Sequence, residues 1–84
     1  MDQGECLDVV ERVIVSPAVG VYHPISPRTS ADLEVGAVIG HIAVPGTDPL
    51  PVCSPFRGRL VEVVAWSGER VGHRQRIAWV RLAA

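Results

Sequence analysis

Val44-Pro45-Gly46-Thr47-Asp48-Pro49-Leu50-Pro51-Val52 joins two halves of the 84-residue chain that repeat one pattern. Its composition predicts a turn, because proline fixes φ, glycine permits positive φ and aspartate can bond its own backbone. A Ser-Pro-x-x-Gly motif stands at residues 16–20 and again at 54–58, 38 residues later. Identities at this offset fall at turn and core-type positions, namely Ser16/Ser54, Pro17/Pro55, Gly20/Gly58 and Ile39/Ile77. The sequence therefore predicts an internal repeat, residues 13–46 and 51–84, joined by an exposed hairpin.

The composition is that of one globular domain, with 48% hydrophobic and 20% charged residues. A net charge of −1 argues against a nucleic-acid partner. No apolar run approaches the roughly 20 residues of a membrane span, so no membrane partner is expected. Residues 1–8 are acidic and lack the apolar core of a signal peptide. We expect them to form a loose leader before a domain at 9–84, and we expect a cytoplasmic protein.

Short β-branched runs separated by glycine and proline predict an all-β fold. The first strand is expected from Val9-Val10 through 13–15, and the second starts at Gly20 and breaks at Pro24. Further strands are expected at 38–44, 50–53, 59–66 and 77–82, with 59–66 the longest. No stretch has helical periodicity over ten or more residues. Many short strands with close turns predict a sandwich or barrel.

Four motifs carry a resemblance to a known family: Ser16-Pro17-Ala18-Val19-Gly20-Val21-Tyr22, Leu33-x-x-Gly36-x-x-Ile39-x-x-Ile42, Ser54-Pro55-x-x-Gly58 and Gly68-x-x-Val71-x-x-Arg74-x-x-Ile77. Over residues 13–82 the chain resembles the biotinyl/lipoyl domain family. Residues 16–27 are similar to the biotin carboxyl carrier protein of acetyl-CoA carboxylase, although the loop called the thumb is shorter here. The resemblance implies a barrel-sandwich hybrid, a flattened β-barrel of two quasi-symmetric antiparallel four-stranded sheets. Arg74 replaces a glycine of the family, so that turn is expected to be rebuilt.

The family carries its cofactor on a lysine at the tip of the central hairpin. By the resemblance, that tip falls at Gly46 and Thr47. All eight basic residues of this chain are arginines, and there is no lysine. Because amide attachment of biotin or lipoate needs an amine, the attachment site is degenerate. We expect no cofactor and no modification of the hairpin.

Catalytic and metal-binding residues are not predicted. His23, His41 and His73 fall at a loop entry, on a strand and in a turn, so we expect nothing to bring them together. Cys6 and Cys53 lack metal-ligand spacing, and Cys53 is expected to be a small core residue. Ser16 and Ser54 precede prolines and are interpreted as turn formers. Whether the chain is an enzyme stays open, with a non-enzymatic role favoured.

The second half of the chain offers the partner-binding candidates, which are Trp66, Arg57, Arg59, Arg70 and Arg74. One interpretation is a solvated basic face. The other is a docking face for an acidic protein or for a second copy, including a homodimer. The predicted function is an unmodified accessory or interaction subunit of a carboxylase-like or biosynthetic assembly. The alternative is a divergent carrier or catalyst that holds a small molecule near Tyr22 and His23, or a cargo on Cys53 or Thr47.

Overall fold

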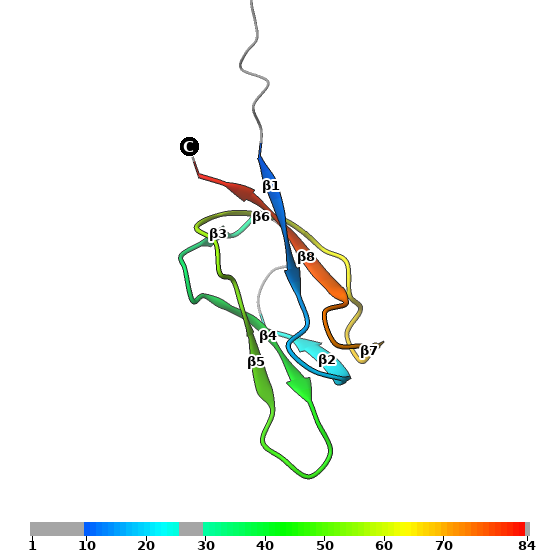
Figure 1. The fold of residues 1–84 in the computed structure, drawn as a ribbon. Helices are drawn as coiled ribbons and strands as arrows, with labels where there is room; N and C mark the ends of the chain where they lie inside the picture. The colour runs from blue at the N-terminus through cyan, green and yellow to red at the C-terminus, as the bar shows by residue number, and fades with distance from the viewer. Residues whose placement is uncertain (1–9, 26–29, 84) are drawn as a thin grey trace, which may run out of the picture.

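The computed structural model describes residues 10–25 and 30–83, and this part of the chain folds entirely into strands and turns (Figure 1). The strands are β1 (Glu11–Val15), β2 (Gly20–Pro24), β3 (Asp32–Leu33), β4 (Val38–Ala43), β5 (Leu50–Cys53), β6 (Gly58–Val63), β7 (Arg70–Val71) and β8 (Arg76–Leu82). The described part contains no helix long and apolar enough to cross a membrane. The predicted leader at 1–8 and most of the thumb loop, residues 26–29, lie outside the described residues.

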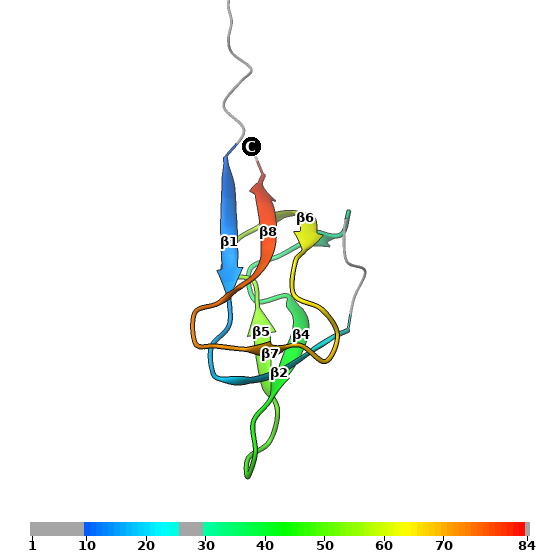
Figure 2. The same ribbon diagram turned by 90° about the vertical axis from the view of Figure 1, so that its right-hand side faces the viewer.

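Two antiparallel four-stranded sheets make up the fold, in the orders β1-β8-β6-β3 and β5-β4-β2-β7. Figure 2 shows them as two layers, with the β4–β5 hairpin extending beyond them. The prediction of an all-β barrel-sandwich arrangement is confirmed, although the sheets do not close into one continuous barrel. Both sheets contribute to the core, which consists of Ile14, Tyr22, Leu33, Ile39, Ile42, Val52, Leu60, Val63, Ala65, Val71, Ile77, Ala78 and Val80.

Buried serines form equivalent corners in the two halves. The hydroxyl of Ser16 donates to the carbonyl of Ala18, and that of Ser54 donates to the carbonyl of Phe56, each at 2.7 Å. The exposed fractions of the two serines are 1% and 0%, so an unpaired hydroxyl there would be costly. This geometry explains both residues as turn formers, as the sequence predicted.

Backbone hydrogen bonds recur with the 38-residue offset at the two turns that follow β3 and β7. The amide of Gly36 donates to Ser54 O at 2.7 Å, and the amide of Arg74 donates to Ser16 O at 2.8 Å. Gly36 has φ 91° and Arg74 has φ 65°. The prediction that Arg74 would rebuild its turn is therefore wrong. The bond to Ser16 holds arginine in the left-handed region, at a cost of about 1 kcal/mol.

The predicted strand at 59–66 ends earlier than expected. The ladder of β6 stops at Val63, because the amides of Val64 and Ala65 both donate to one acceptor, Ile77 O, at 2.8 and 3.2 Å. With one carbonyl shared between two amides, regular pairing cannot continue. The longest strand is instead β8, with seven residues.

Candidate functional site

The β4–β5 hairpin projects from the sheets (Figure 1), and its tip is the position that the family resemblance assigns to the attachment residue. Residues 45–51 are exposed. Gly46 has φ 82°, and a Cβ built there meets no atom within 4 Å. Thr47 closes the turn with its amide on Val44 O at 3.3 Å, and its hydroxyl donates to Asp48 O at 2.8 Å. The tip therefore presents a hydroxyl and backbone groups to solvent, with no amine.

A mainly apolar groove of about 330 Å³ lies at the base of this hairpin. Val21 of β2 faces Ala43 of β4, and Arg70 of β7 pairs with Val21 on the other side. The groove is lined by Val19, Gly20, Val21, Ala43, Val44, Pro45 and Arg70. Of these residues, only Arg70 is a candidate predicted from the sequence. The other lining residues were not predicted. Val21 and Ala43 form an outward-facing apolar pair beside the hairpin, and this pair can be recognised only when the strand register is known.

Tyr22 belongs to the core and not to a ligand site. Its side chain is fully buried, and its hydroxyl donates to Ile39 O at 3.1 Å. The alternative in which Tyr22 and His23 together line a small-molecule cleft is therefore wrong for Tyr22. The two side chains point to opposite faces of β2, because successive residues of a strand alternate.

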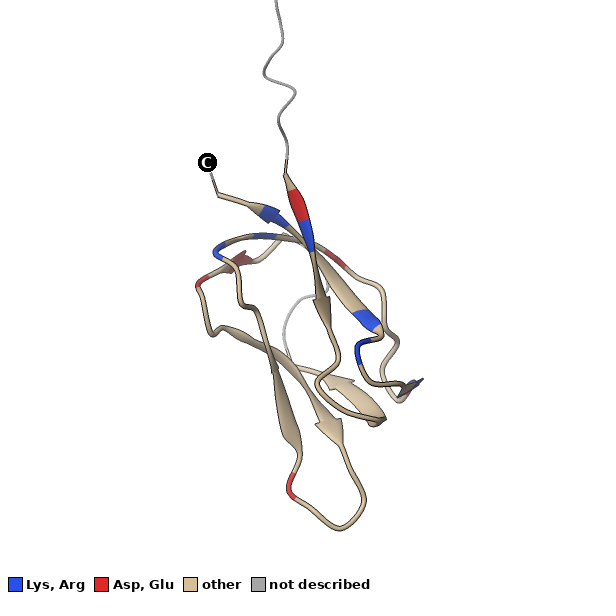
Figure 3. Cartoon of the chain, viewed as in Figure 1, with Lys and Arg blue, Asp and Glu red and all other residues tan. Residues whose placement is uncertain are grey.

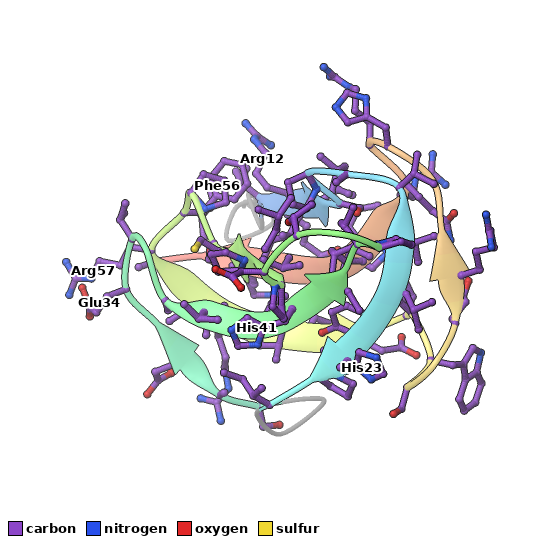
Figure 4. The ribbon with its side chains drawn as sticks, turned by 90° about the horizontal axis from the view of Figure 1, so that it is seen from below. Arg12, His23, Glu34, His41, Phe56 and Arg57 are labelled. Atoms are coloured by element: carbon purple, nitrogen blue, oxygen red, sulfur yellow. The ribbon has the colours of Figure 1, made fainter. Side chains whose placement is uncertain are left out.

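His23 and His41 face each other across β2 and β4, which corrects the expectation that nothing brings the histidines together. His23 is exposed and His41 is half-buried (Figure 4). His73 lies apart, in the turn between β7 and β8. Within the described residues, no three side chains of histidine, cysteine, aspartate or glutamate converge into a metal centre.

Cys53 is exposed, so the prediction of a core cysteine is wrong. Val52 takes the inward position of β5 with 1% exposure, and alternation turns Cys53 outward. Its thiol is therefore accessible at an edge strand, where the sequence alone indicated an apolar run.

Trp66 lies in the turn after β6, and 70% of its surface is exposed. The carboxylate of Glu69 fixes this turn, because it accepts the Trp66 amide at 2.8 Å and a bond from Gln75 Nε2 at 3.0 Å. The Glu69 amide in turn donates to Trp66 O at 3.0 Å. A rigid turn thus presents a large aromatic side chain to solvent, as the partner-binding interpretation requires.

The basic residues are spread over several elements of the chain (Figure 3), and the candidate arginines do not form one cluster with Trp66. Arg57 and Arg59 lie at the start of β6, and Trp66 follows its other end. Arg57 and Arg59 line a second cavity of about 370 Å³, where Arg57 sits 3.8 Å from Glu34. Arg70 begins β7 just after the tryptophan turn, and Arg74 lies in the next turn. Of the four candidate arginines, Arg70 is the one nearest to Trp66 along the chain.

No family model and no curated protein matches the chain. Among solved structures, it is similar to a single-chain, multi-domain long-chain acyl-CoA carboxylase, with 19% identity and a TM-score of 0.77 over 87% of this chain and 7% of that one. It is also similar to a succinylglutamate desuccinylase/aspartoacylase from Rhodobacter sphaeroides, with 19% identity and a TM-score of 0.69 over 86% of this chain and 22% of that one. The chain thus has the fold of a small part of each protein. Because the two proteins differ in activity, this fold does not select a function by itself.

Proposed function

We propose that this chain is a carrier-like β domain that acts through protein contacts, without a covalently attached biotin or lipoate. Its role would be that of an accessory or interaction subunit in a carboxylase-like or biosynthetic assembly. The fold shared with part of an acyl-CoA carboxylase supports the first half of this proposal. The observation that carries the second half is the exposed hairpin tip at Gly46 and Thr47 in a chain without lysine.

The chemical argument concerns the nucleophile. Biotin and lipoate are attached as amides, and an amide forms when an amine attacks the activated carboxyl group. At this tip the side chains are the hydrogen of Gly46 and the hydroxyl of Thr47, and the hydroxyl already donates to Asp48 O. An alcohol at this position would give an ester, which is a different and more labile bond.

The first prediction is that the chain gains no mass when it is co-expressed with a biotin-protein ligase or a lipoate ligase. Thr47→Lys is expected to gain one biotinyl or lipoyl group, since it puts an amine on the same exposed turn. Intact-mass spectrometry checks both results. An acylated wild-type chain would contradict the proposal.

Thr47 is a better position for this lysine than Gly46. Gly46 has φ 82°, and a lysine there would strain the turn by about 1 kcal/mol. Thr47→Arg is the matched control, because it adds a long cationic side chain without an acylable amine. If Thr47→Lys stays unmodified while Gly46→Lys is acylated, the assignment of the tip shifts by one residue and the proposal stands.

The protein contact is proposed to centre on Trp66 and Arg70. Trp66 is the largest exposed apolar side chain of the described residues, and Glu69 holds its turn in place. A pre-ordered aromatic anchor loses little conformational entropy on binding, and a neighbouring arginine attracts an acidic surface. A second copy is the first partner to test, since the acidic residues of the first half complement the arginines of the second.

The second prediction is that Trp66→Ala weakens this association by about 2 kcal/mol, or about 30-fold in Kd. The turn itself should survive, because Glu69 bonds to the backbone of residue 66 and not to the indole. Sedimentation over a concentration series measures the effect. Arg70→Glu should also weaken association, and added salt should mimic it. Arg57→Glu, at the other end of β6, is the matched control and should change little.

A chain that stays monomeric at every concentration and salt level would contradict self-association. A different protein partner would then have to be sought with the same Trp66 and Arg70 variants, again with Arg57→Glu as the control.

The non-lysine carrier stays a second candidate because Cys53 is exposed on β5. A thioester or disulfide cargo at this thiol would add mass to the wild-type chain and not to Cys53→Ser. The intact-mass measurement on chain isolated without reductant therefore separates the two candidates.

A further inference from the structure

His23 and His41 are direct cross-strand partners on the outer face of the sheet β5-β4-β2-β7. Their neighbours along each strand define this face. Tyr22 and Ile42 are opposite each other and fully buried, so the next pair along the strands must point outward. Figure 4 shows the two imidazoles emerging from β2 and β4.

An irregularity in β4 places His41 on this face. The register shifts between Val38 and Gly40, and both Ile39 and Gly40 are buried. A Cβ built on Gly40 would lie 2.5 Å from the Tyr22 ring, so this residue also faces the core. Because two successive residues, Ile39 and Gly40, both face the core, the inward–outward alternation shifts by one residue. His41 therefore points outward, on the same face as its partner His23.

The spacing of the pair suits chelation of one ion. Directly opposite residues of antiparallel strands have Cβ atoms about 4.5–5.5 Å apart. Two imidazole nitrogens bound to one metal ion, each about 2.1 Å from it, lie about 3 Å from each other. Rotation about the two side-chain torsions of each histidine can close this difference, and His23 is exposed and free to rotate into the space above the sheet.

The neighbours of the pair favour a metal that prefers nitrogen. The residues that flank the two histidines on this face, or pair with His41, are uncharged: Val21, Ala43 and Pro51. These neighbours supply no carboxylate for a hard ion such as Mg²⁺ or Ca²⁺. Arg70, the cross-strand partner of Val21, is a cation on the same face, at a position diagonal to His23. Imidazole nitrogens suit Zn²⁺, Cu²⁺ and Ni²⁺.

We propose that His23 and His41 form a two-imidazole chelating site for a late divalent transition metal on the outer face of this sheet. The remaining coordination positions are filled by water or by a ligand from another molecule. The ion would tie β2 to β4 close to the hairpin that β4 begins, so binding also stabilises the folded state through linkage. This inference goes beyond the proposed docking function and does not depend on it.

Titration calorimetry with Ni²⁺ tests the site, in a background where Cys6 and Cys53 are serine so that thiolates do not compete. One ion per chain is expected to bind. His23→Gln and His41→Gln should each lower the association constant by roughly 100-fold, because either change converts a chelate into a single ligand. His73→Gln, the matched control in a distant turn, should bind as the parent does. All three side chains reach solvent, and circular dichroism should show an unchanged fold.

The double variant distinguishes chelation from separate binding. When both histidines hold one ion, His23→Gln/His41→Gln binds only slightly more weakly than either single variant. Two independent sites would instead give two ions per chain, with one lost in each single variant. That result, or an effect of His73→Gln as large as that of the pair, would overturn the proposal.

Discussion

Gly58→Ala is expected to remove a large part of the stability of the folded chain. An added Cβ would lie 2.2 Å from Arg81 O and 2.9 Å from Arg81 C on the paired strand β8. These are backbone atoms of the paired strand, so the clash can be relieved only by moving that strand. We expect a loss of about 3 kcal/mol or more. A domain of this size has a total stability of roughly 4–12 kcal/mol. Urea unfolding followed by circular dichroism measures the change.

Gly72→Ala is the matched control for this prediction. An added Cβ there has only Gln75 Oε1 at 3.9 Å for a neighbour, and Gly72 is not among the residues with positive φ. Its free energy of unfolding should change by less than about 1 kcal/mol. Gly20→Ala should behave like Gly58→Ala, because its Cβ would meet Ala43 O at 2.4 Å. Equal unfolding midpoints for Gly58→Ala and Gly72→Ala would contradict the close approach of β6 and β8.

Tyr22→Ala is the second large effect, with an expected loss of about 4 kcal/mol. Tyr22 heads the fully buried side chains by volume, and its ring packs against Gly40 at the β4 irregularity. Removing it leaves a cavity at the centre of the sheet and takes away the hydrogen bond to Ile39 O. Thermal unfolding with calorimetry measures the loss.

Tyr22→Phe separates the two contributions. It keeps the ring and removes only the hydroxyl, so it should cost about 1 kcal/mol. A similar loss for Phe and Ala would mean that the hydroxyl, and not the packing of the ring, gives Tyr22 its importance. Wild-type stability in Tyr22→Ala would show that Tyr22 is accessible, and would restore it as a ligand-binding candidate.

The proposals for function depend on few residues outside the core. The two solved structures with this fold differ in activity, so a function has to be inferred from individual sites and not from the fold itself. The proposed absence of a cofactor depends on the hairpin tip, the proposed docking depends on the Trp66 turn, and the proposed metal site depends on the histidine pair. Each is tested by a substitution that leaves the core intact.

Features that depend on local chemistry could be predicted from the amino-acid sequence. The two Ser-Pro corners, the exposed turn at Gly46 and the strand at 50–53 were predicted from proline, glycine and β-branched residues. The absence of an attachment amine is also a property of the composition alone. These conclusions needed no knowledge of which strands pair, because turn residues act on their own few neighbours.

Which side chains share a face, by contrast, depends on how the strands pair and could not be predicted from the sequence. The sequence placed His23 and His41 apart, Cys53 inside, and Arg57 and Arg59 together with Trp66, and the structure places each of them otherwise. The length of β6 separates Arg57 and Arg59 from Trp66. For Cys53 and His41 the physical reason is that side-chain direction alternates along a strand, and a shift of one residue moves every later side chain to the other face. Such shifts occur at Val38/Gly40 in β4 and at Leu60/Glu62 in β6. They are set by pairing between distant segments, which no local pattern of residues records.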